Sequence, residues 1–265
     1  MIILKRISIL WLGSIVLGSI LIHLGSLNIS ELVDAKNIFS LPGGAHWLGT
    51  DSMGRDLFFR ILKGSGTSLL VAASSILIST ILALVYGSVS GWFGGRVDWV
   101  LMVILDVWMS LPSSVLAIVI AMLLVRERDS LILVSVVIGL THWGRLARIV
   151  RSEVEALRNR EFVVATKIIG ASNLQIMRSH LVPHLLAVVE TFVIYQFPNY
   201  ILAESFLSFV GLGVQPPNTS WGILIQDGWR SLQVFPHVVL APALFLSITI
   251  LSLKLLFLNA EKLSQ

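Results

Sequence analysis

The sequence predicts an all-α membrane protein with six transmembrane helices and a cytoplasmic helical loop between the fourth and the fifth. Hydrophobic residues make up 55% of the 265 residues and charged residues only 13%, against about 25% in typical soluble proteins. The mean hydropathy is +0.88. A chain of this length has no core large enough for so many apolar side chains, so lipid must cover many of them. A water-soluble globule is therefore disfavoured.

Five stretches are long and apolar enough to cross a bilayer, which takes about 20 helical residues. A sixth stretch, 131–143, is shorter and lies between Arg128 and Arg145, so a re-entrant segment is the alternative there. We expect the first stretch to be an uncleaved helix rather than a signal peptide, because its apolar run is longer than a usual signal core. The five run over 7–27, 67–90, 99–125, 184–210 and 237–258.

The positions of the basic residues predict the topology, because Lys and Arg favour the cytoplasmic side. Lys5 and Arg6 precede the first stretch, and the segment 145–183 carries the largest basic cluster of the chain. Both lie on one side only if 131–143 counts as a span, which makes six helices with both termini in the cytoplasm. The cluster consists of Arg145, Arg148, Arg151, Arg158, Arg160, Lys167 and Arg178.

The chain lacks several common catalytic motifs. It has no Gly-Lys dipeptide for a Walker A loop, no His-Glu pair for a zinc-protease helix and no cysteine. The run Gly87-Ser88-Val89-Ser90-Gly91 is closest to a serine-hydrolase motif, but small residues in such a helix predict close helix packing. We therefore expect no catalytic residue, no metal site and no cofactor bound by this chain.

Nothing divides the chain into domains: neither an internal repeat nor a low-complexity tract is found in it. We expect one transmembrane domain over 1–265, with an N-terminal helix at 7–27, a core over about 67–258 and a cytoplasmic loop over about 151–183.

The loop over 151–183 predicts a helical hairpin. Ser152 and Glu155 form a capping box that would begin a first helix, and the following residues favour helix as far as Ile169. Gly170 would end that helix, because a left-handed residue after a helix is usually glycine.

The second half of the hairpin begins with another capping box, Ser172 with Gln175, and Pro183 marks where its helix ends or bends. The faces of the hairpin mix apolar and charged residues, as a docking surface does. The alternative is an amphipathic hairpin that lies on anionic lipid.

The same hairpin resembles the "EAA" loop of ABC-importer permeases. That loop has Glu-Ala-Ala, three residues, Gly, nine residues, Ile, one residue and Leu-Pro. Ala165, Gly170 and Pro183 match in register. Val164, Thr166, His180 and Val182 replace the family's Glu, second Ala, Ile and Leu.

Further segments are similar, in the same order, to the C-type permeases of dipeptide, oligopeptide and nickel importers. His46-Trp47-Leu48-Gly49-Thr50-Asp51 followed by Gly54-Arg55-Asp56 looks like their GTD..GRD signature before the second helix. The segments 91–98, 111–113, 208–217 and 220–222 are similar to their short cytoplasmic turn, third helix and last outer loop.

The resemblance implies a fold like that of type I ABC-importer permeases, in the bacterial inner membrane. It implies a second related permease, two ABC ATPase subunits that hold ATP and Mg, and an extracytoplasmic solute-binding protein, with no nucleic-acid partner. The cargo would be nickel, a metal chelate or small peptides, with the nickel branch slightly favoured. The alternative function is an ion- or proton-coupled secondary transporter.

The resemblance also assigns an ATPase-coupling role to part of the hairpin, with Gly170 setting the turn and the charged residues as rim contacts. These residues are Arg160, Glu161, Val164, Ala165, Thr166, Lys167, Gly170, Ser172 and Pro183.

Candidate residues of the substrate path are prolines and acidic residues inside the spans. Pro112 and Pro198 favour kinks, and Asp106, Glu190 and Glu204 are ionisable residues at depth, which are usually functional. Glu190 and Glu204 are fourteen residues apart, about 40° around a helix, so we expect both on one face turned away from lipid.

Overall fold

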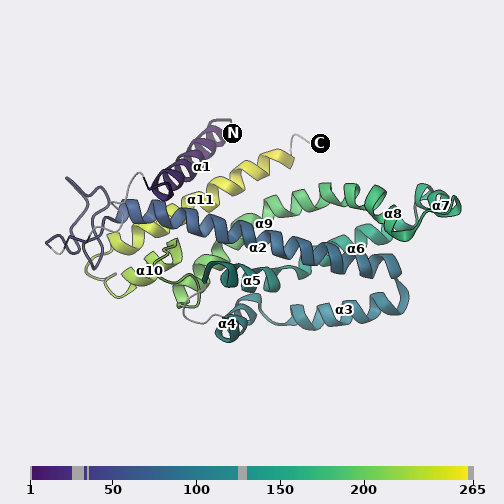
Figure 1. The fold of residues 1–265 in the computed structure, drawn as a ribbon. Coiled ribbons are helices and arrows are strands. Elements are labelled where there is room, and N and C mark those ends of the chain that lie inside the picture. Colours follow the sequence, from purple (N-terminus) through teal and green to yellow (C-terminus); the bar gives the residue numbers. More distant parts are fainter. Residues whose placement is uncertain (1, 26–32, 35, 125–129, 262–265) are drawn as a thin grey trace. The chain divides into compact units, whose positions relative to one another are not determined.

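The computed structural model describes residues 2–25, 33–34, 36–124 and 130–261, and helices dominate this part of the chain (Figure 1). The all-α prediction is confirmed. The end of the predicted first span, 26–27, and Arg128 lie outside the described residues. The helices are α1 (Ile2–His23), α2 (Leu57–Phe93), α3 (Gly95–Ser110), α4 (Ser113–Leu124), α5 (Ser130–His142), α6 (Gly144–Arg158), α7 (Glu161–Ile168), α8 (Asn173–Ile176), the π-helical turn η2 (Met177–Leu181), α9 (Val182–Val210), α10 (Trp221–Trp229) and α11 (His237–Glu261).

Four of these helices, α1, α2, α9 and α11, are each long and apolar enough to cross a membrane. Two bent pairs, α3 with α4 and α5 with α6, reach that length only together. The predicted six spans agree with the structure if each bent pair crosses once.

The predicted third span, 99–125, is not one helix. The chain bends by 89° between α3 and α4, and Leu111 between them has an extended backbone, φ −85° and ψ 138°. Pro112 explains the break, because proline lacks an N–H and its ring forces the preceding residue out of the helical region.

The predicted start of the hairpin at Ser152 is also wrong. Ser152 lies exposed in the middle of α6, which begins at Gly144. One face of α6 buries Leu146, Val150 and Val154, and this apolar stripe holds the helix through the serine. The break falls instead at Asn159, just before α7.

Helix α2 continues well beyond its predicted ends. Its 37 residues span about 55 Å at 1.5 Å per residue, which exceeds the hydrocarbon thickness of about 30 Å. Asp56 begins it as N-cap, since its Oδ1 accepts the backbone N–H groups of Phe58 and Phe59 at 2.9 and 3.2 Å. The first turns, up to Gly66, therefore lie outside the predicted apolar span.

The chain forms two compact units. Unit 1 comprises 1–73, 120–135 and 198–265. In it α1 and α10 both pack against α11. The Trp11 indole N–H donates to Thr249 Oγ1 at 3.1 Å.

Unit 2 comprises 74–119 and 136–197. Its core gathers around the buried face of α6, which meets Trp92 of α2 and Leu105 of α3. Close approach of α2 and α6 confirms the packing prediction for Gly87 and Gly91. A Cβ on either glycine would lie 2.4–2.5 Å from a carbonyl oxygen of α6.

Candidate functional site

Seven of the nine predicted coupling residues lie on a hairpin formed by α7, the turn 169–172 and α8, which we call the coupling hairpin; Arg160 precedes it and Pro183 lies in α9. Two of its side chains, Val163 and Ile176, are fully buried in the core of unit 2. Arg160 precedes α7, and its N–H donates to the carbonyl of Leu157 at 3.0 Å. The hairpin is thus anchored to α6 by both apolar and backbone contacts.

Gly170 ends α7 as predicted. Its φ is +93°, a left-handed conformation that glycine adopts without steric cost. The N–H of Ala171 donates to the carbonyl of Thr166 at 3.2 Å, which is the hydrogen bond of a Schellman cap. The turn is therefore a defined structure.

Ser172 caps the second arm, again as predicted. Its hydroxyl accepts the N–H of Gln175 at 3.3 Å, which satisfies one free donor at the start of α8. The α-helical winding then changes to the π-helical turn η2, and Pro183 is the second residue of α9.

The tip of the coupling hairpin exposes large apolar side chains. Ile168 and Ile169 are 80% and 86% exposed, and Phe162 is 45% exposed. Among the predicted polar contacts, Arg160 and Glu161 are exposed beside them. Ala165 and Thr166 lie on α7 as well, where Thr166 donates its hydroxyl to the carbonyl of Phe162 at 2.6 Å. Val164 and Lys167 belong to the same helix.

Charged residues outside the predicted site fix the helix next to this hairpin. Arg151 of α6 donates to both carboxylate oxygens of Asp98, at 2.8 and 2.5 Å, and Ser90 donates to the same carboxylate at 2.5 Å. Arg158 donates to the carbonyl of Trp92 at 3.0 Å. These bonds fix α6 to the turn between α2 and α3.

The predicted path residues belong to both units, with Asp106, Pro112 and Glu190 in unit 2 and Pro198 and Glu204 in unit 1. Asp106 is exposed and pairs with the equally exposed Arg148 at 2.5 Å. Pro112 is exposed at the break between α3 and α4, whereas Pro198 is buried within α9.

Glu190 is exposed in the isolated chain, so the expectation that its side chain is turned away from lipid stays a prediction. Glu204 is fully buried. Its carboxylate accepts hydroxyl hydrogen bonds from Ser208 and Ser205, at 2.7 and 3.3 Å, and from Ser68 and Ser220. Four serine hydroxyl groups thus surround the carboxylate in the second half of α9.

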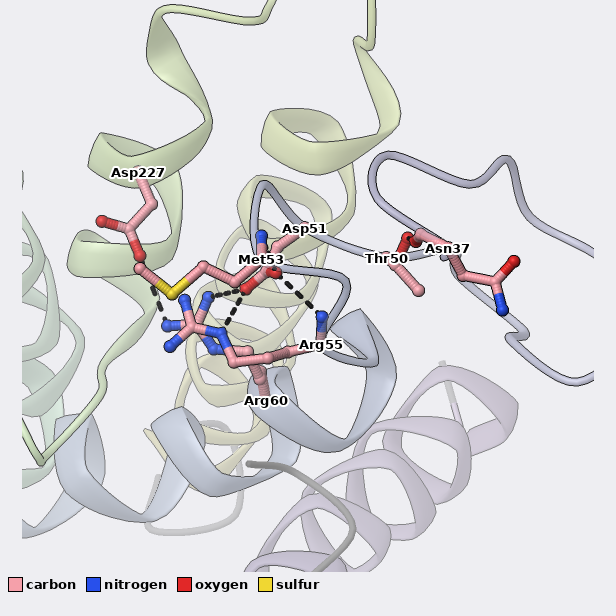
Figure 2. A network of polar contacts seen from close by, with 7 residues as sticks. All are labelled: Asn37, Thr50, Asp51, Met53, Arg55, Arg60 and Asp227. Carbon is pink, nitrogen blue, oxygen red and sulfur yellow. Dashed lines mark hydrogen bonds and ion pairs between the residues drawn. The ribbon is translucent and has the colours of Figure 1, made fainter. Parts of the chain in front are cut away.

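A second polar cluster, which we call the Asp51 network, lies at the start of α2 (Figure 2). Asp51 is buried, and its Oδ2 accepts from Arg55 Nε at 2.7 Å and from Arg60 Nη1 at 2.5 Å. Its Oδ1 accepts the backbone N–H groups of Met53 and Arg55 at 2.8 and 3.0 Å. Arg60 also reaches Asp227 of α10 at 3.3 Å.

Electrostatics keep the Asp51 carboxylate ionised. Burial alone would raise its pKa, but the charge of Arg60 and the hydrogen bonds from Arg55 and Met53 outweigh burial and lower the pKa below the ordinary value of 3.8. One carboxylate thus holds two guanidinium groups in fixed positions.

The Asp51 network borders a cavity of about 350 Å³, the Arg55 pocket. Three cations line it, Arg55, Arg60 and Lys63, with Asp227 as the acidic residue among the lining groups. The sequence showed Asp51 and Arg55 only as part of a signature. Arg60 and Lys63 could have been found from the sequence, because two charges one turn apart at the start of an apolar helix are unusual.

Among the described residues, no three His, Cys, Asp or Glu side chains lie together as a metal site requires. The described residues thus offer an exposed apolar tip in unit 2 and a pocket lined by basic residues in unit 1.

Comparison with known families decides the kind of protein. A family profile described as "Binding-protein-dependent transport system inner membrane component" matches residues 83–263. The chain belongs to this family. The resemblance inferred from the coupling hairpin and the outer segments is thereby confirmed, and the chain is a multi-pass membrane protein of a binding-protein-dependent transport family.

Relatives within this transport family are peptide permeases by name. The chain is 39% identical over 207 residues to the oligopeptide transport system permease protein OppC of Haemophilus influenzae, which covers 78% of this chain and 66% of that protein. It is 39% identical over 209 residues to the dipeptide transport system permease protein DppC of Lactococcus lactis, with 79% and 60% covered. The chain thus spans less than two thirds of either relative.

The fold of the transport family also appears in a solved structure. A chain of the MetNI methionine ABC transporter in an inward-facing conformation superposes with a TM-score of 0.59 at 16% identity, over 79% of this chain and 98% of that one. At this identity the likeness shows the fold alone.

Proposed function

We propose that the chain is the transmembrane permease subunit of an ATP-driven importer that carries short peptides delivered by a solute-binding protein. The family match and the oligopeptide and dipeptide permeases among its relatives support this function. Peptides are favoured over nickel or a metal chelate because these relatives are named for peptides. No finding on the described residues favours an ion- or proton-coupled transporter.

The observation that carries the proposal is the apolar tip of the coupling hairpin. Large exposed apolar patches at a protein surface mark interaction sites, and here Ile168 and Ile169 project from a hairpin that Val163 and Ile176 anchor in the core. Such a hairpin can transmit a movement, whereas a loose loop would absorb it. We propose that a groove of an ABC ATPase covers this tip.

The other subunits of the transporter and its topology follow from this proposal. Two ATPase subunits bind ATP and Mg, a second related permease completes the path, and the binding protein docks from outside. The basic hairpin and both termini lie in the cytoplasm, so the segments between α1 and α2 and between α9 and α11 face outward. Asp106, Pro112, Glu190, Pro198 and Glu204 stay proposals for the path, with Glu204 as its buried member.

The test is the substitution Gly170→Val in the assembled transporter. A β-branched residue at φ +93° costs about 1–2 kcal/mol, so the turn that ends α7 will change shape. We expect ATP hydrolysis to continue while peptide uptake per ATP falls about tenfold. Uptake and phosphate release are measured in proteoliposomes.

Gly44→Val is the matched control. Gly44 also has a positive φ, +50°, with open space around it, and it lies far along the chain from the hairpin. It should leave the uptake per ATP unchanged. Normal coupling in the Gly170→Val transporter would show that the hairpin does not transmit the ATPase movement.

A further inference from the structure

Three of the side chains that line the Arg55 pocket are basic. Arg55, Arg60 and Lys63 line it together with Asp227, and Asp51 lies behind the two arginines. Basic residues outnumber acidic ones among the described lining residues, so the polar groups of the pocket suit an anionic ligand.

Arg55 has the geometry to bind that anion. Asp51 holds its Nε at 2.7 Å, which leaves both terminal nitrogens without a hydrogen-bond partner among the described residues. The side chain is 21% exposed and lines the pocket. A guanidinium fixed in this way presents paired donors that match a carboxylate or phosphate.

Thr219 gives a second and independent indication. Thr219 is 6% exposed, and its hydroxyl is buried without a hydrogen-bond partner among the described residues. Buried polar groups are almost always paired, and an unpaired one calls for an explanation. Since Thr219 also lines the pocket, a ligand oxygen would satisfy its hydroxyl.

We propose that the Arg55 pocket binds the terminal carboxylate of a short peptide. Arg55 pairs with the carboxylate, and Thr219 donates a hydroxyl hydrogen bond to it. The inference rests on the proposed function, because it takes the ligand from the class of molecule that the transporter carries.

The other walls fit a peptide better than a bare phosphate. Val33, Met53, Pro216 and Ile223 give the pocket an apolar side, where a peptide side chain can lie. Asp227 supplies an acceptor for an ammonium group. The volume of about 350 Å³ lies at the small end of the range for ligand pockets, roughly 300–1,000 Å³.

The test is photolabelling of the assembled transporter in nanodiscs with a dipeptide that carries a benzophenone on its second residue. The dipeptide is used as the free acid and as the C-terminal amide, and mass spectrometry locates the label. We expect the acid to label Met53 or Ile223, and the amide to label them about tenfold less or weaker still, because it loses the charged hydrogen bond. This comparison needs no variant, so it does not depend on how a mutant folds.

Variants then assign the contacts. Arg55→Gln and Thr219→Val should each reduce labelling by the acid several-fold, toward the level of the amide. Arg230→Gln is the matched control, because Arg230 is an exposed cation at the end of α10 outside the pocket lining. The Arg230→Gln transporter should be labelled as strongly as the wild type.

Competitors identify the source of the anion. Unlabelled dipeptide should displace the probe, whereas inorganic phosphate and phosphatidylglycerol vesicles should not. Displacement by either of these, or equal labelling by acid and amide, would overturn the assignment. Peptide uptake is measured in the same preparation: uptake without carboxylate-dependent labelling contradicts the pocket alone, and absent uptake with active ATPases contradicts the proposed function.

Discussion

In the coupling hairpin, buried apolar side chains hold the exposed apolar tip in place, whereas at the Arg55 pocket a buried carboxylate holds a partly exposed cation. Val163 and Ile176 hold the hairpin by dispersion and burial, which are not directional interactions. Asp51 holds Arg55 and Arg60 by hydrogen bonds, which orient each donor. Contact surfaces tolerate small shifts, but a ligand needs aimed donors, so the two modes of anchoring fit the two proposed tasks.

The two modes also differ in how they fail. A truncated apolar anchor leaves a cavity into which the neighbours partly relax. A removed carboxylate leaves buried cations that repel each other and have lost their partner. A substitution in the Asp51 network should therefore lower the stability of the protein more than a substitution of similar size in the coupling hairpin.

The largest effect is expected for Asp51→Ala. It leaves Arg60, which is buried, and Arg55 without their shared carboxylate. Loss of one partner of a buried ion pair costs about 3–5 kcal/mol, which corresponds to a fall in Tm of roughly 10 °C. Thermal unfolding of the purified full chain in detergent measures it.

Asp34→Ala is the control for that change. Asp34 belongs to the same segment between α1 and α2 and accepts local hydrogen bonds from the Lys36 backbone and the Asn37 side chain, but it is far less buried than Asp51. Its removal should leave Tm nearly unchanged. Equal effects of the two substitutions would mean that the Asp51 network is not the anchor of this end of the chain.

The second prediction compares two isoleucines of the coupling hairpin. Ile176→Ala removes a fully buried anchor and should destabilise the protein by about 2–5 kcal/mol. Ile168→Ala changes a side chain that is 80% exposed, so its effect on stability should stay within about 0.5 kcal/mol.

The same pair should behave in the opposite way toward the ATPase. Ile168→Ala removes part of the docking tip and should weaken co-purification of the ATPase subunits, a measurement separate from Tm. An Ile168→Ala protein that retains its partners fully would show that the tip is not the contact, and the comparison of anchor and tip would fail.

Features encoded by short stretches could be predicted from the sequence. The left-handed Gly170 and the Ser172 cap depend on neighbours within five residues, so their signals are complete locally. Pro112 predicted a kink, but the sequence around it does not specify an angle of 89°. The capping box at Ser152 predicted a helix start that is absent there, because burial of the apolar stripe of α6 outweighs a local cap worth about 1 kcal/mol.

Features that join distant segments could not be predicted. The contact of Arg60 with Asp227 links residues 167 positions apart. The burial of Thr219 and the hydroxyl shell of Glu204 likewise depend on segments that meet only in the folded chain. In a single sequence these groups look like ordinary loop or helix residues.

The smallest effect is expected from pH and separates charge from shape in the Asp51 network. Because the pKa of the folded Asp51 lies below its unfolded value, its ionisation contributes stability that is fully present above the unfolded pKa. That contribution is lost as the pH falls through the lower folded pKa.

Protonation keeps the volume and the backbone hydrogen bonds of Asp51, so the loss should be smaller than for Asp51→Ala. The Tm of the wild type should therefore fall by a few degrees more between pH 6 and acid conditions, about pH 3–4, than the Tm of Asp51→Asn, which has no carboxyl group at this position to protonate. Parallel Tm profiles of the two proteins would show that the negative charge of Asp51 does not hold the two arginines, and the orienting role that distinguishes the Arg55 pocket from the coupling hairpin would then belong to its backbone hydrogen bonds.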